Sequence, residues 1–99
     1  MLVLEHIVGF EWDQGNARKN EKHGVSQSES EQVFFDPQLL MVADASHSVR
    51  EPRYHALGMT FAGRHLHITF TLRNRMMRIR IISARPMHRK ERRFYEQQS

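Results

Sequence analysis

The segment 78–85 constrains the fold of this chain more than any other stretch. Its isoleucines are β-branched and no Gly or Pro interrupts them, which predicts a β-strand. Side chains alternate along a strand, so Ile79 and Ile81 are expected on one face and Arg78 and Arg80 on the other. Guanidinium groups match phosphate oxygens in geometry and keep their charge, so the second face is suited to binding anions. The pattern is equally typical of the solvated face of an antiparallel sheet, and both interpretations stay open at this point.

Composition predicts a single folded domain over residues 1–99, and its charge suggests an anionic partner, although a charge of this size also fits an ordinary soluble protein. Hydrophobic residues make up 39% of the 99 residues and charged residues 26%, values typical of a globular protein. The formal net charge is +4, and the stretch 73–93 holds nine Lys or Arg residues and a single acid, Glu91. Such a basic stretch favours a nucleic acid or an acidic protein as partner.

Missing residue types exclude several classes of site. The sequence has no Cys, which excludes disulfides, thiolate metal sites and a Cys nucleophile. No apolar run approaches the roughly 20 residues that cross a bilayer, and no signal peptide is visible. We therefore expect a cytoplasmic protein with no membrane partner.

Capping and turn residues divide the chain into helices and strands. Asp13 is a typical N-cap and Gly24 a typical C′ residue, which places a helix between them. Ser26 and Glu29 have the spacing of a capping box, and Pro86 precedes a basic final helix. The predicted elements are a first strand near 7–10, helices over 14–23, 26–34 and 87–98, and strands over 39–42, 53–61, 65–72 and 78–85.

The predicted strands share one apolar face. In the strand 65–72 the even-numbered residues are apolar, whereas His65 and His67 face the other side. In the strand 53–61, alternation places the large residues Leu57 and Met59 on the apolar face together with His55. We predict the fold class α+β, with N-terminal helices and a C-terminal helix packed on one face of a small antiparallel meander sheet. The His and Arg face is then left open as the candidate functional surface.

Three kinds of chemistry fit this open face. An enzyme that cleaves RNA without a metal needs a base for the 2′-hydroxyl, an acid for the 5′-oxygen and cations for the phosphate. The candidates are His67, His65 and His23 as acid or base, Arg53, Arg78, Arg80 and Arg85 as cations, and Tyr95 as a proton donor. A nucleic-acid binding module would use the same basic surface without chemistry, although only two His rings are available there for stacking.

A metal site is the third alternative. His65 and His67 lie on one side of their strand, as two imidazole ligands would. However, His55 is expected on the apolar side, and no carboxylate is in register with the pair. We therefore predict no metal and no other cofactor.

A series of short motifs runs through nearly the whole chain in a specific order and spacing. The motifs are Phe10-Glu11-Trp12-Asp13, Lys22-His23-Gly24-Val25-Ser26, Val33-Phe34-Phe35-Asp36-Pro37, Glu51 with Arg53, Ala56-Leu57-Gly58, Arg80-Ile81-Ile82-Ser83-Ala84-Arg85 and Arg89-Lys90-Glu91-Arg92-Arg93-Phe94-Tyr95-Glu96. No single motif is decisive, but together they resemble the BrnT family of toxins.

This resemblance implies a ribonuclease toxin of a type II toxin–antitoxin system, with a fold related to the RelE toxins. Such toxins cleave RNA without a metal and so inhibit translation. The implied partner is a BrnA-like antitoxin with a ribbon-helix-helix DNA-binding domain, so that operator DNA is bound only through the antitoxin. An acidic antitoxin segment over the basic face would block RNA binding.

The resemblance and the strand pattern together select the candidate site. The family motifs match at Lys22, His23, Glu51, Arg53, Arg80, Arg85 and Tyr95. The predicted catalytic residues are Arg53, His67, Arg80 and Arg85, and the predicted RNA-binding residues are Lys22, His23, Arg78, Arg89 and Tyr95. Of these, His67 rests on strand alternation alone, and Tyr95 also fits an anchor of the last helix in the core.

Two departures from the family pattern lead to an alternative function. The spacing between Asn20 and Lys22 is one residue tighter than usual, and Pro86 follows Arg85 where related sequences carry a polar residue. Pro fixes the direction of the chain at the point where Arg85 must be aimed. The alternative is a catalytically decayed toxin-like module that only binds antitoxin or nucleic acid.

Overall fold

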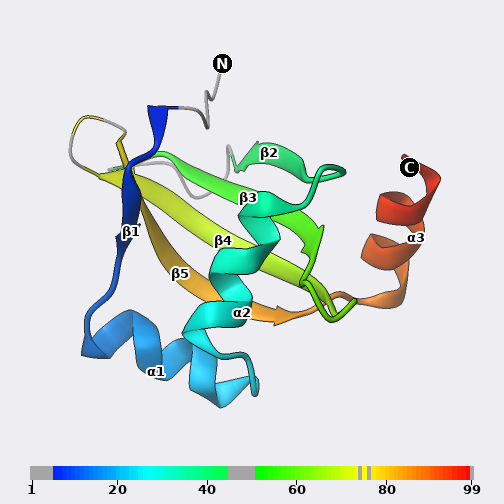
Figure 1. The fold of residues 1–99 in the computed structure, drawn as a ribbon, viewed down its shortest axis with the longest axis horizontal. Coiled ribbons are helices and arrows are strands. Elements are labelled where there is room, and N and C mark those ends of the chain that lie inside the picture. Colours follow the sequence, from blue (N-terminus) through cyan, green and yellow to red (C-terminus); the bar gives the residue numbers. More distant parts are fainter. Residues whose placement is uncertain (1–5, 45–50, 74, 76, 99) are drawn as a thin grey trace.

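The computed structural model describes residues 6–44, 51–73, 75 and 77–98, which form an α+β fold (Figure 1). A five-stranded sheet in the order β1-β5-β4-β3-β2 is its centre. The elements are β1 (Gly9–Glu11), α1 (Gln14–Lys22), α2 (Gln27–Gln32), the 3₁₀ turn η2 (Val33–Phe35), β2 (Leu40–Asp44), β3 (Arg53–Met59), β4 (His65–Arg73), β5 (Arg78–Pro86) and α3 (Arg89–Gln97). Among these helices, none has the length and apolar character needed to cross a membrane.

The sheet is mixed, so the prediction of a purely antiparallel meander is wrong. Strands β2 to β5 do form a meander in which each strand pairs antiparallel with the next. Strand β1 instead pairs parallel with β5, and its Phe10 lies opposite Ile79. In the described part of the chain α1, α2, η2 and strands β2 to β4 come between β1 and β5, so this parallel contact joins strands that are far apart in the sequence.

The capping predictions for the first two helices are confirmed. The backbone N–H of Asn16 donates to Asp13 Oδ1 at 3.1 Å, and Gly24 has a left-handed φ of 70°. Ser26 and Glu29 form the reciprocal capping box at the start of α2. Each of these caps depends only on residues that are close in the sequence, so the sequence alone is enough to predict it.

A single buried amide fastens α1 to the sheet. The side-chain amide of Asn16 donates to the carbonyl oxygens of Glu11 at 3.0 Å and Ile81 at 2.9 Å. Its Oδ1 accepts from the backbone N–H of Asp13 at 2.7 Å. Since α1 has only one apolar residue, Ala17, hydrogen bonding rather than apolar burial holds this helix in place.

The core lies on the face of the sheet that α2 and η2 cover (Figure 1). Strand β4 contributes Leu66, Ile68 and Phe70 to the core, and β5 contributes Ile79 and Ile81. All five side chains are fully buried, as the alternation of apolar residues in these strands predicts.

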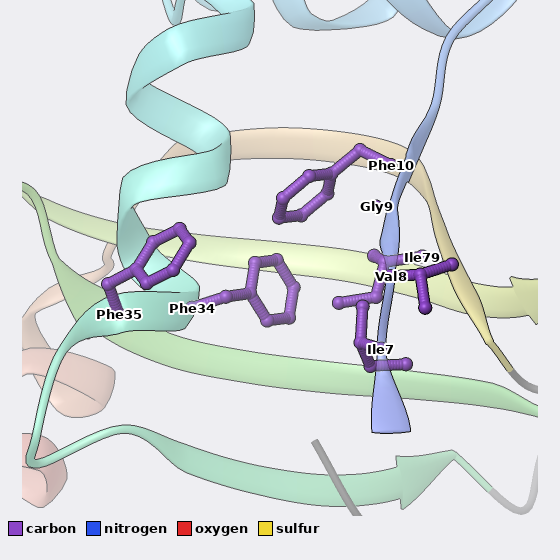
Figure 2. Close-up of a pocket in the computed structure, with 7 residues that line it drawn as sticks. All are labelled: Ile7, Val8, Gly9, Phe10, Phe34, Phe35 and Ile79. Carbon is purple, nitrogen blue, oxygen red and sulfur yellow. The ribbon is translucent and has the colours of Figure 1, made fainter. Parts of the chain in front are cut away.

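Aromatic rings close this core between η2 and β1. Figure 2 shows Phe34 of η2 lying between Phe35 and the strand residue Phe10. The ring of Phe34 packs edge-on against Phe70 with centroids 5.0 Å apart, and tilted against Phe10 with centroids 5.7 Å apart. A hollow of about 230 Å³ remains at this edge, and Val8 and Phe35 are exposed on its rim.

Strand β3 turns its small residues to the core, so the predicted orientation of this strand is wrong. Ala56 and Gly58 are buried, whereas Leu57 and His55 lie on the opposite face. The reason is the close approach of η2: a Cβ atom on Gly58 would lie 2.6 Å from Val33 Cγ1. Only a residue without a side chain fits beneath η2, so the larger residues must face the other way.

A β-bulge in β5 brings two predicted catalytic residues onto one face. Phe70 pairs with Ile81, but the preceding Thr69 pairs with Ser83, so Ile82 is an extra residue in β5. Strict alternation would place residues 80 and 85 on opposite faces. The extra residue reverses the alternation, so Arg85 shares the face of Arg80.

The last helix, α3, is not packed on the apolar face, contrary to the prediction. Its Glu91 forms an ion pair with Arg85, and its Tyr95 ring meets the ring of His65 edge-on at 5.6 Å. Both partners lie on the face opposite the core, and the Tyr95 hydroxyl also donates to Asp36 at the end of η2. Figure 1 accordingly shows α3 beyond the ends of the strands, apart from α1 and α2. A mostly charged helix has no broad apolar stripe with which to cover a core.

The role of Asn16 leads to a first prediction. We expect Asn16→Ala to lower the free energy of unfolding by about 2–3 kcal/mol, because the buried carbonyl of Ile81 and the partly buried carbonyl of Glu11 lose their donor. Urea denaturation followed by circular dichroism measures this. The matched control is Gln14→Ala, at an exposed position of the same helix. Equal stability of the two variants would contradict the proposed anchor.

Candidate active site

The sheet face opposite α2, here called the outer face, carries the candidate site. Strand pairing arranges its side chains in rows that cross the sheet. One row contains Val42, His55, Thr69 and Ser83, and the next contains Leu40, Leu57, His67 and Arg85. A third row contains Thr71 and Arg80, which lie opposite each other on β4 and β5. Polar and cationic groups from β3, β4 and β5 therefore converge on one surface.

His67 occupies the centre of this surface. Its ring lies 4.9 Å from the ring of His55, and only 9% of the residue is exposed. Burial, together with the charge of Arg85, lowers the pKa of His67 to about 4, although Glu91 acts in the opposite direction. His67 is therefore neutral near pH 7 and able to accept a proton.

Arg85 and Glu91 form a two-pronged ion pair beside His67. Arg85 Nη1 lies 2.8 Å from Glu91 Oε1, and Arg85 Nη2 lies 2.9 Å from Glu91 Oε2. Glu91 Oε1 also accepts the backbone N–H of His88 and so caps α3. Burial raises the pKa of Glu91, but the hydrogen bonds from Arg85 and His88 outweigh it and lower the pKa to about 2. This carboxylate thus links α3 to the site and stays ionised.

His67 and Glu91 present two polar atoms that lie close together without bonding to each other. His67 Nε2 lies 3.9 Å from Glu91 Oε2, which is too far for a hydrogen bond. A hydroxyl oxygen beside this gap would reach both atoms at about 2.8 Å. His67 Nδ1 is buried and has no hydrogen-bond partner in the described part of the chain.

His55 and Asp44 hold the histidine pair in position, and sequence reasoning missed both. His55 Nε2 lies 2.8 Å from Asp44 Oδ2, and His55 Nδ1 lies 3.1 Å from Thr69 Oγ1. With both nitrogens engaged, the His55 ring is a fixed surface against His67. The sequence does hold a signal for the outward orientation of His55. Ala56 and Gly58 are small residues that mark the close-packed side of β3, so His55 must lie on the opposite side.

Two of the predicted catalytic residues, Arg53 and Arg80, form a separate group. They line a polar hollow of about 260 Å³ together with Glu51 and the start of α1. Arg80 Nη2 lies 2.8 Å from Asp13 Oδ2, and Arg80 Nη1 lies 3.4 Å from Glu11 Oε1. The predicted set therefore divides into this pair and the group around His67 and Arg85, on the same outer face.

The predicted RNA-binding residues are dispersed. Lys22 and His23 are exposed at the end of α1, and Arg89 is exposed at the start of α3. Arg78 lies on β5 with its guanidinium next to Gly9. Tyr95 is 3% exposed and anchors α3; burial and the hydrogen bond to Asp36 raise its pKa to about 12. Contact of these residues with RNA stays a prediction.

No group of three or more metal-ligating side chains converges within residues 6–44, 51–73, 75 and 77–98. The groups that do converge on the outer face are a neutral imidazole, a guanidinium and a carboxylate. Such groups can accept a proton and stabilise negative charge on a phosphate.

Comparison with known proteins identifies the family. A search of curated proteins finds no match. The family model described as ribonuclease toxin, BrnT, of type II toxin–antitoxin system matches residues 12–91, which is most of the 99-residue chain and includes every residue of the group around His67. The chain therefore belongs to the family of BrnT ribonuclease toxins of type II toxin–antitoxin systems.

Proposed function

We propose that this toxin is a metal-independent endoribonuclease whose cleavage centre is the group of His67, Arg85 and Glu91 on the outer face. The observation that carries the proposal is the buried imidazole of His67 directly opposite Arg85, whose guanidinium is held in place by Glu91. RNA cleavage needs an unprotonated base and a fixed cation at the same phosphate, and this arrangement supplies both.

His67 acts as the base in this proposal. It takes the proton of a ribose 2′-hydroxyl held beside the gap between His67 and Glu91. The 2′-oxygen then bonds to phosphorus, the bond from phosphorus to the 5′-oxygen breaks, and the leaving oxygen takes a proton from water. The products are a 2′,3′-cyclic phosphate and a 5′-hydroxyl end.

Arg85 stabilises the charge that develops on the phosphate during this step. Its guanidinium is held in a fixed orientation by Glu91 and by the carbonyl oxygen of Pro86 at 3.1 Å. A phosphate can approach the side of the guanidinium that Glu91 leaves open, or displace one oxygen of Glu91. Arg53 and Arg80, farther along the same face, bind the flanking RNA phosphates in this proposal.

The family implies an antitoxin partner. We propose that this partner is BrnA-like, carries a ribbon-helix-helix domain and provides the only contact with operator DNA. RNA cleavage in the cytoplasm then inhibits translation, and the fold is related to that of the RelE toxins. The net charge of +4 favours both RNA and an acidic antitoxin segment.

One observation favours the decayed module as a second candidate. Two of the cations on the outer face are already paired with carboxylates of the chain, Arg80 with Asp13 and Arg85 with Glu91. A binding module would retain antitoxin affinity but release no RNA fragments. Purified, folded protein that binds its antitoxin and yields no 2′,3′-cyclic phosphate from any RNA would establish this alternative.

The assignment of the base is tested with His67→Gln, which keeps polarity and volume but cannot accept a proton in the same way. We expect kcat/KM for an RNA oligonucleotide to fall about 100- to 10,000-fold. The matched control is His6→Gln, at an exposed histidine outside the group. A variant that retains full activity with an unchanged circular dichroism spectrum would refute the role of His67.

The pH profile gives an independent test of the same base. His67 must be neutral to accept a proton, and its lowered pKa keeps it neutral down to about pH 4. As pH falls, kcat/KM should therefore decline with a midpoint near 4 rather than near the ordinary histidine value of about 6.5. An acidic limb with a midpoint at 6.5 would mean that a histidine in a different environment is the base.

Metal independence is tested by chelation. We expect the cleavage rate to be the same, within about 2-fold, before and after exhaustive treatment with EDTA, because an imidazole and a guanidinium supply the required groups. Loss of activity that returns with one specific divalent ion would contradict this part of the proposal.

A further inference from the structure

We propose that the cavity between the outer face and α3 binds one unstacked RNA base next to the cleaved phosphate. This inference rests on the proposed ribonuclease function and adds a base-binding subsite to it. The cavity has a volume of about 400 Å³, within the range of natural ligand pockets. Its lining residues are Leu40, Val42, His55, Leu57, His67, Glu91 and Phe94.

The lining suits a flat ring that is apolar on its faces and polar at its edge. Leu40 and Leu57 pair across β2 and β3 and contribute apolar side chains to the lining. Val42 is 58% exposed and Phe94 is 50% exposed, an unusual extent for large apolar side chains that line the same cavity. Exposed aromatic rings on RNA-binding surfaces stack against bases, because every base has a π-face.

The polar part of the lining ties the cavity to the cleavage centre. His67 and Glu91 belong to both, and Arg85 is opposite His67 in the strand register. A base in the cavity therefore brings its own phosphate close to Arg85. This neighbouring cation favours a nucleotide over an apolar protein side chain as the occupant, since a nucleotide satisfies the apolar lining and the guanidinium together.

The position of α3 indicates that the cavity is formed in the absence of RNA. Phe94 and Glu91 reach the cavity from one helix, whereas the other lining residues come from β2, β3 and β4. The bidentate ion pair between Glu91 and Arg85 and the buried Tyr95 hold this helix against the sheet. The cavity is thus formed before RNA arrives, which limits the entropy lost on binding.

The test uses single-stranded RNA oligonucleotides and the variant Phe94→Ala. We expect kcat/KM to fall about 10- to 100-fold, the value of one lost stacking contact, while the pH profile stays unchanged. Phe94→Trp should retain activity because it keeps a ring. The matched control is Phe61→Ala, at a phenylalanine that is 77% exposed and does not line the cavity.

A substrate that lacks the base tests whether Phe94 acts through that base, because the change in the protein and the change in the RNA can be combined. An abasic residue next to the cleavage site should slow the wild type at least as much as Phe94→Ala does, and should slow that variant less than it slows the wild type. Equal effects of the abasic residue on both proteins would overturn the base-binding subsite while cleavage itself persists. Unchanged RNA kinetics in Phe94→Ala, with weakened antitoxin binding, would also overturn it and assign the cavity to the antitoxin.

Binding without cleavage separates this inference from the proposed function. Oligonucleotides with a 2′-deoxy residue at the cleavage site carry 2-aminopurine, whose fluorescence is quenched on stacking, at one position at a time. We expect quenching at a single position in the wild type and Phe61→Ala, and its loss in Phe94→Ala. This pattern would support the subsite even if the wild type cleaved no RNA, and uniform quenching at all positions would refute it.

Discussion

The close contact between η2 and β3 decides which surface of this toxin is available for function. Gly58 lies beneath Val33 with no room for a side chain, so β3 turns its small residues to the core. The larger side chains, His55 and Leu57, must then face outward, where they join His67. The histidine pair and the cavity beside it are therefore consequences of how tightly the 3₁₀ turn packs on the sheet.

The second constraint is the extra residue in β5, and it acts together with α3. Because Ile82 reverses the alternation, Arg85 faces outward beside His67 and meets Glu91 of α3. Removing one partner of a half-buried ion pair leaves the other without compensation, so this contact also fixes the last helix. The carboxylate that holds the helix and the cation proposed to hold the phosphate thus belong to one unit.

This arrangement explains how a small basic protein keeps ordered cations on its surface. Arg80 is held by Glu11 and Asp13, and Arg85 is held by Glu91, so both guanidinium groups are ordered before any ligand arrives. The same carboxylates compete with phosphate, which lowers affinity for any anion that cannot match their geometry. An anion bound at this face must therefore supply contacts beyond its charge.

Local signals in the sequence determined the starts of α1 and α2, the apolar side of β4 and the family. Asp13, Ser26 and Glu29 form caps with residues three positions away, and the apolar residues of β4 alternate without interruption, so no distant contact is needed to interpret them. The motif series likewise led to the BrnT family. Only the tertiary structure decided the parallel pairing of β1, the orientation of β3, the bulge in β5 and the place of α3. Each of these depends on contacts between residues far apart in the chain, such as Gly58 under Val33 or Arg85 against Glu91, and alternation or capping rules cannot express such contacts.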